Sequence, residues 1–170
     1  MKKRDFLQVG GAVVGAIALS RFLPTTATEQ SANLTPASAE GQFPVTKTEA
    51  EWREILTPEE FSVLRQAGTE RPYSSSLNEE KAAGIFHCAG CSTPLYSSET
   101  KFDSGTGWPS FYAALEDAVA TREDRSLMML RTEVHCATCG GHLGHVFDDG
   151  PEPTGDRHCI NGVSLKFEAA

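Results

Sequence analysis

Residues 136–151, CATCGGHLGHVFDDGP, indicate how this 170-residue chain folds. The stretch opens with a Cys-x-x-Cys pair, Cys136 and Cys139, and passes through two glycines that allow a loop to curl. Residues 145–147 are β-favouring, and residues 148–151 have the composition of a tight turn. The stretch therefore predicts a β-strand with a cysteine loop at one end and a sharp turn at the other.

The same β pattern extends on both sides of this stretch. Residues 84–87 are predicted as a strand, and residues 127–134 form a long apolar, β-favouring run. Residues 163–167 alternate apolar with small or polar side chains, which is the period of a half-buried strand. Cys159 and Asn161 share the phase of its apolar residues, so in a regular strand both would point inward. We predict a mainly β fold, an antiparallel sandwich- or barrel-like domain.

Two short helical segments precede the strands. Thr48 with Glu51, and Thr57 with Glu60, have the spacing of capping boxes, in which side chain and backbone cap each other. A proline follows Thr57 at the first helical position, and Gly68 is expected to end the second helix. We predict that this helical preface is structural and packs on the β domain.

Residues 1–39 have the layout of an export signal. A basic start precedes the apolar run Val9–Leu19, whose 11 residues are too few to span a bilayer, which needs about 20. Lys3-Arg4 resembles the twin-arginine motif, with lysine in place of the first arginine. An ordinary signal peptide or an uncleaved anchor is the alternative, and cleavage could follow Ala27 or Ala39.

These features predict three parts and a location. Residues 1–39 are the export signal and cleavage region, residues 40–47 a linker, and residues 48–170 the functional domain. We expect export to a bacterial periplasm, with no stable membrane insertion after cleavage. The net charge is −8, and because residues 1–39 contribute +2, the rest of the chain carries −10. Such an acidic domain repels phosphate backbones, so nucleic acid is not an expected partner.

The five cysteines divide as four plus one. Two Cys-x-x-Cys pairs, Cys88 with Cys91 and Cys136 with Cys139, have the spacing of a tetrahedral four-cysteine zinc site. Such a site is closed and structural, and it would clip two distant hairpins together. Redox-active pairs, plain disulfides or an iron–sulfur cluster are the alternatives, and export favours disulfides.

Cys159 remains without a partner. It follows Arg157 and His158, and a cysteine beside basic residues is a candidate nucleophile because the thiolate is the reactive form. His142 and His145 could lie nearby. Taken singly, the plainer interpretations hold: a lone cysteine is usually a small buried apolar residue, and a histidine is usually structural or a metal ligand.

Taken together, these segments resemble one family, the B-type methionine-R-sulfoxide reductases. The resemblance is carried by GTGWPSF at 105–111, by GHLGHVFDDGP at 141–151, by RHCIN at 157–161 and by the two cysteine pairs. It covers roughly residues 48–168. It implies a β-sandwich-like zinc-containing domain that reduces the R epimer of methionine sulfoxide in oxidised proteins.

The resemblance also implies roles for individual residues. Cys159 matches the nucleophile, which attacks the sulfoxide sulfur and is left as a sulfenic acid. His142 and His145 match residues that orient the substrate oxygen and protonate it, and Asn161 matches a residue that supports them. Trp108 matches the apolar wall for the substrate methyl group.

Three positions depart from the family pattern. Position 158 is His instead of the usual Tyr, and position 162 is Gly instead of Ser, which raises the possibility that Asn161-Gly162 forms a hairpin turn. Thr106 stands where many members carry a resolving cysteine. The expected reductant is therefore an external thiol, a thioredoxin-like protein. The alternative activity is that of a thiol–disulfide oxidoreductase using a Cys-x-x-Cys pair.

Overall fold

The computed structural model describes residues 43–170, so the export signal predicted for residues 1–39 lies outside the described residues. Two α-helices come first, α1 (Glu49–Ile55) and α2 (Pro58–Gln66), followed by the 3-10 turn η1 (Ser76–Asn78). The rest is mostly β-structure. The strands are β1 (Gly84–Cys88), β2 (Pro94–Ser97), β3 (Lys101–Phe102), β4 (Ser110–Phe111), β5 (Val119–Asp124), β6 (Arg131–Cys136), β7 (His142–Phe147), β8 (Arg157–Ile160) and β9 (Leu165–Ala169).

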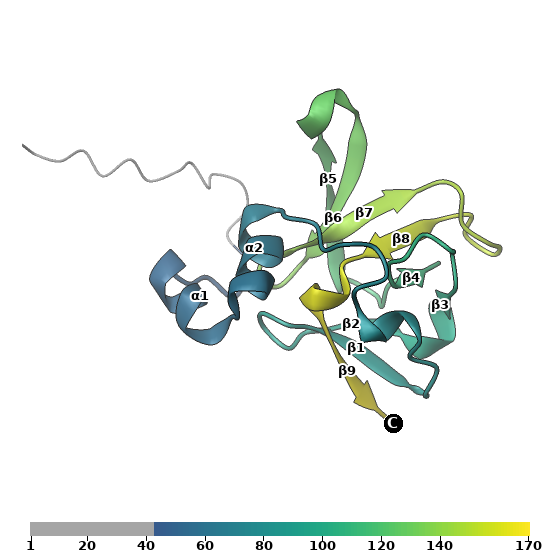
Figure 1. Cartoon of the computed structure of the whole chain (residues 1–170), viewed down its shortest axis with the longest axis horizontal. Helices are drawn as coiled ribbons and strands as arrows, with labels where there is room; N and C mark the ends of the chain where they lie inside the picture. Colours follow the sequence, from purple (N-terminus) through teal and green to yellow (C-terminus); the bar gives the residue numbers. More distant parts are fainter. Residues whose placement is uncertain (1–42) are drawn as a thin grey trace, which may run out of the picture. The chain divides into compact units, whose positions relative to one another are not determined.

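The strands form two antiparallel sheets. A three-stranded sheet has the order β2-β1-β9, and a six-stranded sheet has the order β3-β4-β8-β7-β6-β5 (Figure 1). Every recorded strand pair is antiparallel. The prediction of a mainly β, antiparallel fold is confirmed.

Aromatic side chains join the two sheets. Phe86 of β1 and Tyr96 of β2 both contact Phe111 of β4, with ring centroids 5.0 Å and 4.4 Å apart. All three side chains are fully buried. Large rings bury more area than any other side chains, so this cluster contributes much of the apolar stabilisation between the sheets.

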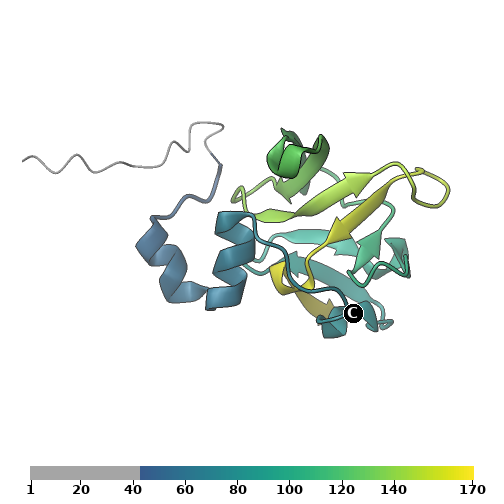
Figure 2. The ribbon, with the colours of Figure 1, turned by 45° about the horizontal axis from the view of Figure 1, so that its top comes forward.

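The helices form as their caps predict. Thr48 and Thr57 each accept a hydrogen bond from the backbone of the glutamate three residues later, and that glutamate caps the threonine in return. The end of α2 differs from the prediction by one residue. Ala67, with φ of 52°, takes the left-handed position expected for Gly68. The helices lie together at one end of the sheets (Figure 2).

Residues 127–134 do not form the predicted continuous strand. Residues 126–128 form a 3-10 turn, η3, and β6 begins only at Arg131. The first part of the apolar run lies at the tip of the β5–β6 hairpin, where Met128, Met129 and Leu130 are exposed. β propensity depends on packing against neighbours, and a hairpin tip supplies little of it.

The strand predicted to run from Cys159 to Phe167 is also interrupted. After Ile160 the chain leaves the six-stranded sheet, and after the 3-10 turn η4 (Gly162–Ser164) it joins the three-stranded sheet as β9. This change of sheet requires a bend, so Val163 belongs to the turn and not to a strand.

Two further points concern the start of the described chain. Val45 N donates a 2.9 Å hydrogen bond to Thr138 O, and Phe43 packs edge-on against His135. The last residues of the predicted linker thus pack on the second cysteine loop. Within residues 43–170, no helix is long and apolar enough to cross a membrane.

Candidate active site and metal centre

The two cysteine pairs come together in one cluster. Cys88 ends β1 and Cys136 ends β6, and each pair continues into the turn that follows its strand. The Sγ atoms of all four cysteines lie within 4.8 Å of one another. The cluster therefore joins the β1–β2 hairpin of one sheet to the β6–β7 hairpin of the other, as the sequence predicts.

The sulfur–sulfur distances fit tetrahedral coordination of one metal ion. Cys88 Sγ lies 3.8 Å from Cys139 Sγ, and Cys91 Sγ lies 3.6 Å from Cys136 Sγ. Four sulfurs at about 2.3 Å from a central zinc ion would be separated by about 3.8 Å. The four side chains are suited to hold a metal ion. The close contacts run between the two pairs, which favours one shared cage over two separate redox motifs.

Helix α2 covers this cage. A Cβ atom on Gly141 would lie 2.9 Å from a Leu64 methyl group and 3.3 Å from Cys139 Sγ, so glycine permits the close approach of helix and loop. Gly140 adopts φ of +67° at the same turn. Arg65 donates a 3.0 Å hydrogen bond to Cys139 O. The helical preface is structural in the sense predicted, because it shields the cage.

Cys159 lies in a different environment, near the middle of the six-stranded sheet. Strand β8 is flanked by β4 and β7 (Figure 1), and Cys159 is directly opposite Ser110 on one side and His145 on the other. Side chains opposite each other in an antiparallel pair have Cβ atoms about 4.5–5.5 Å apart. His145 is therefore a close neighbour of Cys159.

A pocket of about 150 Å³ opens at this position. A cavity of about this size accommodates a benzene-sized molecule, which is comparable to an oxidised methionine side chain. The pocket brings together four residues predicted for the site, and adds four that the sequence analysis did not assign to it. Its lining is Cys159, His145, Asn161, Trp108, Thr69, Arg131, Gly144 and Phe147.

His145 is held from behind by a carboxylate. Its Nε2 lies 2.8 Å from Asp124 Oδ2, and Arg131 donates to the same oxygen at 2.7 Å. A carboxylate only accepts, so Nε2 carries the proton and Nδ1 of the neutral ring is free to accept one. Burial lowers the pKa of His145, although Asp124 opposes this effect. His145 is therefore mostly neutral at pH 7.

His142 lies behind His145 and does not line the pocket. Residues three apart on a regular strand face opposite sides, but the β6–β7 register shifts between Val134 and His135, which places one extra residue in β7. This bulge turns His142 towards His145, with ring centroids 5.4 Å apart. Such bulges commonly re-aim side chains beside active sites.

Glu133 fixes the orientation of His142. His142 Nδ1 lies 2.8 Å from Glu133 Oε1, and both side chains are buried. Burial alone would raise the pKa of Glu133, but hydrogen bonds from His142 and Arg122 bring it down to about 2. The carboxylate is therefore charged, and His142 donates to it through Nδ1–H.

Asn161, predicted to support the histidines, and Trp108, predicted as the apolar wall, also line the pocket. Asn161 Nδ2 donates to Leu143 O at 2.9 Å, and Trp108 Nε1 donates to Glu70 O at 3.2 Å. Asn161 does not form the alternative hairpin turn, since it enters η4 with extended backbone angles. The sequence analysis missed Glu70 and Arg131. Glu70 carries no recognisable local pattern, and Arg131 was hidden in the apolar run assigned to a strand.

Comparisons with known proteins agree with this geometry. The SelR domain matches residues 56–169, which is well over half of the chain. The chain belongs to the SelR family. Relatives include proteins named peptide methionine sulfoxide reductase MsrB. That of Methanosarcina mazei is 58% identical over 127 residues, covering 74% of this chain and 91% of the relative. That of Leifsonia xyli is 53% identical over 133 residues, covering 77% and 96% respectively.

The SelR match contains both the cage and the pocket. Two of the positions that depart from the expected family pattern, 158 and 162, lie beside this pocket without lining it. His158 points away from the pocket, because its Nδ1 lies 3.1 Å from the hydroxyl oxygen of the buried Tyr96. Gly162 is required by close packing, since a Cβ there would clash with Ser75 Cβ. Neither departure displaces Cys159 or Asn161 from the pocket lining.

Arg157 is the positively charged group that acts on the pKa of Cys159. Arg157 binds Asp149 through two hydrogen bonds of 2.8 Å and 3.0 Å, and it stacks on Phe147 with 4.5 Å from its guanidinium carbon to the ring centroid. Burial raises the pKa of the Cys159 thiol above its ordinary value, and Arg157 and Thr106 oppose that rise. The resting residue is therefore a thiol at neutral pH, less acidic than its basic neighbours suggest.

Proposed function

We propose that this SelR-family protein is an enzyme that reduces methionine-R-sulfoxide in oxidised proteins to methionine, with Cys159 as the nucleophile. The observation that carries the proposal is the pocket in which Cys159, His145, Asn161 and Trp108 meet. Its relatives are named for the reduction of peptide methionine sulfoxide. A sulfoxide is apolar at its methyl group and polar at its oxygen, and the pocket offers an aromatic face and polar groups together.

The reaction needs a thiolate and an acid. Cys159 Sγ attacks the sulfoxide sulfur and forms an S–S bond, and the oxygen is protonated and leaves that sulfur as hydroxide. The hydroxide then adds to Cys159 Sγ, which breaks the S–S bond and releases methionine. Since Nε2 of His145 is engaged by Asp124, Nδ1 is the atom that takes the thiol proton and returns it to the oxygen. The sulfoxide sulfur gains two electrons and becomes methionine. The sulfur of Cys159 loses two electrons and becomes a sulfenic acid.

The second half of the cycle requires two external thiols. One thiol attacks the sulfenic acid, releases water and forms a mixed disulfide with Cys159. A second thiol breaks that disulfide and restores the Cys159 thiol. Thr106 provides a hydroxyl near Cys159 in place of a resolving thiol, and the other four cysteines are committed to the cage. We therefore propose a thioredoxin-like dithiol protein as the reductant.

We further propose that the cage holds one zinc ion. The four thiolates complete a tetrahedron, which leaves no open position for substrate, so the ion would contribute structure and not chemistry.

We also propose that the protein is exported. Export through the twin-arginine route would allow the ion to be loaded before translocation, because that route carries folded proteins. Fractionation of cells that make the full chain tests this location, and retention in the cytoplasm would count against it.

A reduction assay on separated epimers tests the main proposal. With dithiothreitol as the thiol, we expect the full chain to consume the R epimer of a methionine sulfoxide peptide and leave the S epimer. Cys159→Ser should lose activity by about 10³-fold or more and keep its fold. Activity on the S epimer alone, or full activity in the variant, would refute the proposal. If Cys88→Ser stayed folded but lost turnover while Cys159→Ser did not, a thiol–disulfide oxidoreductase would be favoured.

A further inference from the structure

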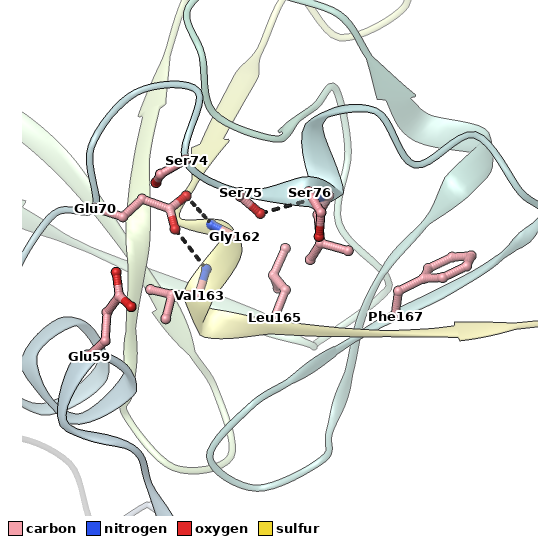
Figure 3. Close-up of a pocket in the computed structure, with 10 residues that line it drawn as sticks. Glu59, Glu70, Ser74, Ser75, Ser76, Gly162, Val163, Leu165 and Phe167 are labelled. Atoms are coloured by element: carbon pink, nitrogen blue, oxygen red, sulfur yellow. Dashed lines mark hydrogen bonds between the residues drawn. The ribbon is translucent and has the colours of Figure 1, made fainter.

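Glu70 is a buried carboxylate that holds a backbone segment next to the pocket. It is 7% exposed, and none of the ion pairs recorded among residues 43–170 includes it. Its two oxygens accept hydrogen bonds from Gly162 N at 2.6 Å and from Val163 N at 3.0 Å (Figure 3). The segment that it holds follows Cys159 by three residues.

The backbone of Glu70 contacts two walls of the pocket. Its N–H donates to Asn161 Oδ1 at 3.0 Å, and its carbonyl accepts from Trp108 Nε1 at 3.2 Å. Residues far apart in the sequence therefore meet at one residue of the segment between α2 and η1. A shift of the Glu70 backbone would move the amide of Asn161 and the indole of Trp108 together.

The carboxylate also changes what Asn161 can do. Asn161 is the N-cap of η4, and asparagine at that position normally caps the turn with its own side chain. Here its side chain makes no capping hydrogen bond, and the Glu70 carboxylate binds the first N–H groups of the turn instead. The Asn161 amide does not cap the turn. It is held instead between Glu70 N and Leu143 O, and it lines the pocket that contains Cys159.

We infer that Glu70 is a positioning residue for the reaction: its carboxylate fixes residues 161–163 against residue 70 and so sets the positions of Asn161 and Trp108 around the bound sulfoxide. The role rests on the proposed function. Glu70 itself does not line the Cys159 pocket. It lines a second cavity of about 370 Å³, and the 161–163 segment separates the two, with Asn161 on one and Gly162 on the other.

Burial of the Glu70 carboxylate has an electrostatic cost. Burial raises the pKa of Glu70, the hydrogen bonds from residues 162 and 163 oppose the rise, and the nearby Glu59 adds to it. A carboxyl group whose burial outweighs its hydrogen bonds is ionised at a cost in folding free energy relative to its protonated form. Residues that serve a site commonly carry such a penalty.

Packing around Gly162 keeps the held segment in place. A Cβ on Gly162 would clash with Ser75 Cβ and lie 3.3 Å from Glu70 Oε1. No rotation of the Ser75 side chain moves its Cβ, so a larger residue at position 162 must displace the backbone. Gly162 is therefore part of the same arrangement, and a substitution there should disturb the site without removing any polar group.

The first test compares kinetics of three variants in the full chain. Glu70→Ala should lower kcat/KM for the R-sulfoxide peptide by about 10- to 100-fold, because small displacements of positioning groups have effects of this size. Glu70→Gln keeps the shape and one acceptor, so its loss should be smaller. Glu59→Gln, at the same cavity, should match the wild type. The alkylation rate of Cys159 by iodoacetamide should stay the same in all three, since strands β4 and β7 hold that residue.

The second test does not depend on turnover. The chain has two tryptophans, Trp52 and Trp108, so ¹⁵N spectra contain two indole N–H resonances. Glu70→Ala and Glu70→Gln should shift the resonance of Trp108, whose N–H binds Glu70 O, and leave that of Trp52 in place. Folded Glu70 variants with wild-type kcat/KM, or with reduced kcat/KM and an unshifted Trp108 resonance, would overturn the inference.

A size-swap pair gives an independent check. Gly162→Ala should reproduce the kinetic loss and the Trp108 shift, and Ser75→Gly in the same chain should restore both by making room for the added methyl group. Failure of the second substitution to restore either would count against the inference. If the wild type reduced neither sulfoxide epimer, the proposed function would fail, while the resonance shifts would still report whether Glu70 sets the position of Trp108.

Discussion

The cage and the pocket use the same atom, a cysteine sulfur, in opposite settings. In the cage, four sulfurs lie at strand ends and in the turns that follow, within 4.8 Å of one another and beneath α2. In the pocket, one sulfur lies in a central strand between β4 and β7, facing a cavity of about 150 Å³. The first setting excludes everything except an ion, whereas the second leaves room for a side chain.

The difference fits the two proposed roles, structural for the cage and chemical for the pocket. Turns can curl two thiolates onto a single point, which suits a metal ion, and a closed tetrahedron offers nothing to a substrate. A central strand holds a single thiol in register with a histidine on the next strand. Ladder hydrogen bonds on both sides fix that register, so the reacting groups do not depend on a mobile loop.

Breaking the cage should have the largest effect of any change. Metal binding to four-cysteine sites contributes about 10 kcal/mol or more to folding, which is comparable to the whole stability of a domain. We expect Cys136→Ser to lose the metal and to unfold at 25 °C, as followed by circular dichroism and metal analysis. Cys159→Ser is the matched control and should retain both. A metal-free Cys136→Ser protein with the wild-type melting temperature would show that the cage is not structural.

The helix starts and the joining of the two cysteine pairs could be predicted from the sequence, because each depends on residues at a short, fixed spacing. Capping boxes depend on residues three apart, so Thr48 and Thr57 were sufficient to place both helix starts. The joining of the two cysteine pairs also followed from their spacing. Prediction from the sequence fails where tertiary packing determines the structure of a segment. The apolar residues Met128 to Leu130 satisfy a strand pattern, yet they form an exposed hairpin tip.

The pocket could be predicted only in part, for the same reason. Cys159, His145, Asn161 and Trp108 were expected from the family resemblance, and all four line it. The position of His142 depends on a bulge in β7, and bulges arise from pairing with another strand. Glu70 contacts residues 91 to 93 positions away, so no window of sequence contains both partners.

Removing the imidazole of His145 should lower activity at the pocket and leave the cage intact. A positioned acid–base group contributes about 10²- to 10⁴-fold, so His145→Ala should lower kcat by that factor and keep its metal and melting temperature. His87→Ala, on β1 of the smaller sheet, is the control and should keep full activity. Asp124→Asn should give a smaller loss, because Nε2 of His145 keeps an acceptor. A His145→Ala protein with wild-type kcat would remove His145 from the mechanism.

Removing the charge of Arg157 should change how the reactivity of Cys159 depends on pH. Burial raises the pKa of Cys159 and Arg157 opposes the rise, so Arg157→Met should raise that pKa further. The thiolate fraction at pH 7 should then fall, and the rate of alkylation by iodoacetamide should fall by about tenfold for each unit of pKa. Wild type and variant should converge at high pH, where both are thiolates.

The exposed Arg125, which pairs with Glu123, supplies the control for this measurement. Arg125→Met should leave the alkylation profile unchanged. Equal profiles for Arg157→Met and the wild type would show that the guanidinium does not act on the thiol. Retention of the metal in each variant would confirm that the cage is insensitive to charge at the pocket.

Adding a sixth cysteine at Thr106 should have the smallest effect on rate and a clear effect on product. The Thr106 side chain is close enough to Cys159 to lower its pKa, so we expect a thiol there to attack the sulfenic acid. After one turnover without reductant, we expect Thr106→Cys to contain one disulfide between residues 106 and 159, identified by peptide mapping. The wild type should instead form an adduct with a sulfenic-acid reagent. Ser98→Cys, in the 3-10 turn after β2, should behave as the wild type. A disulfide from Thr106→Cys to any cage cysteine would contradict the separation of the two settings, because it would mean that the cage cysteines are accessible to a thiol in the pocket.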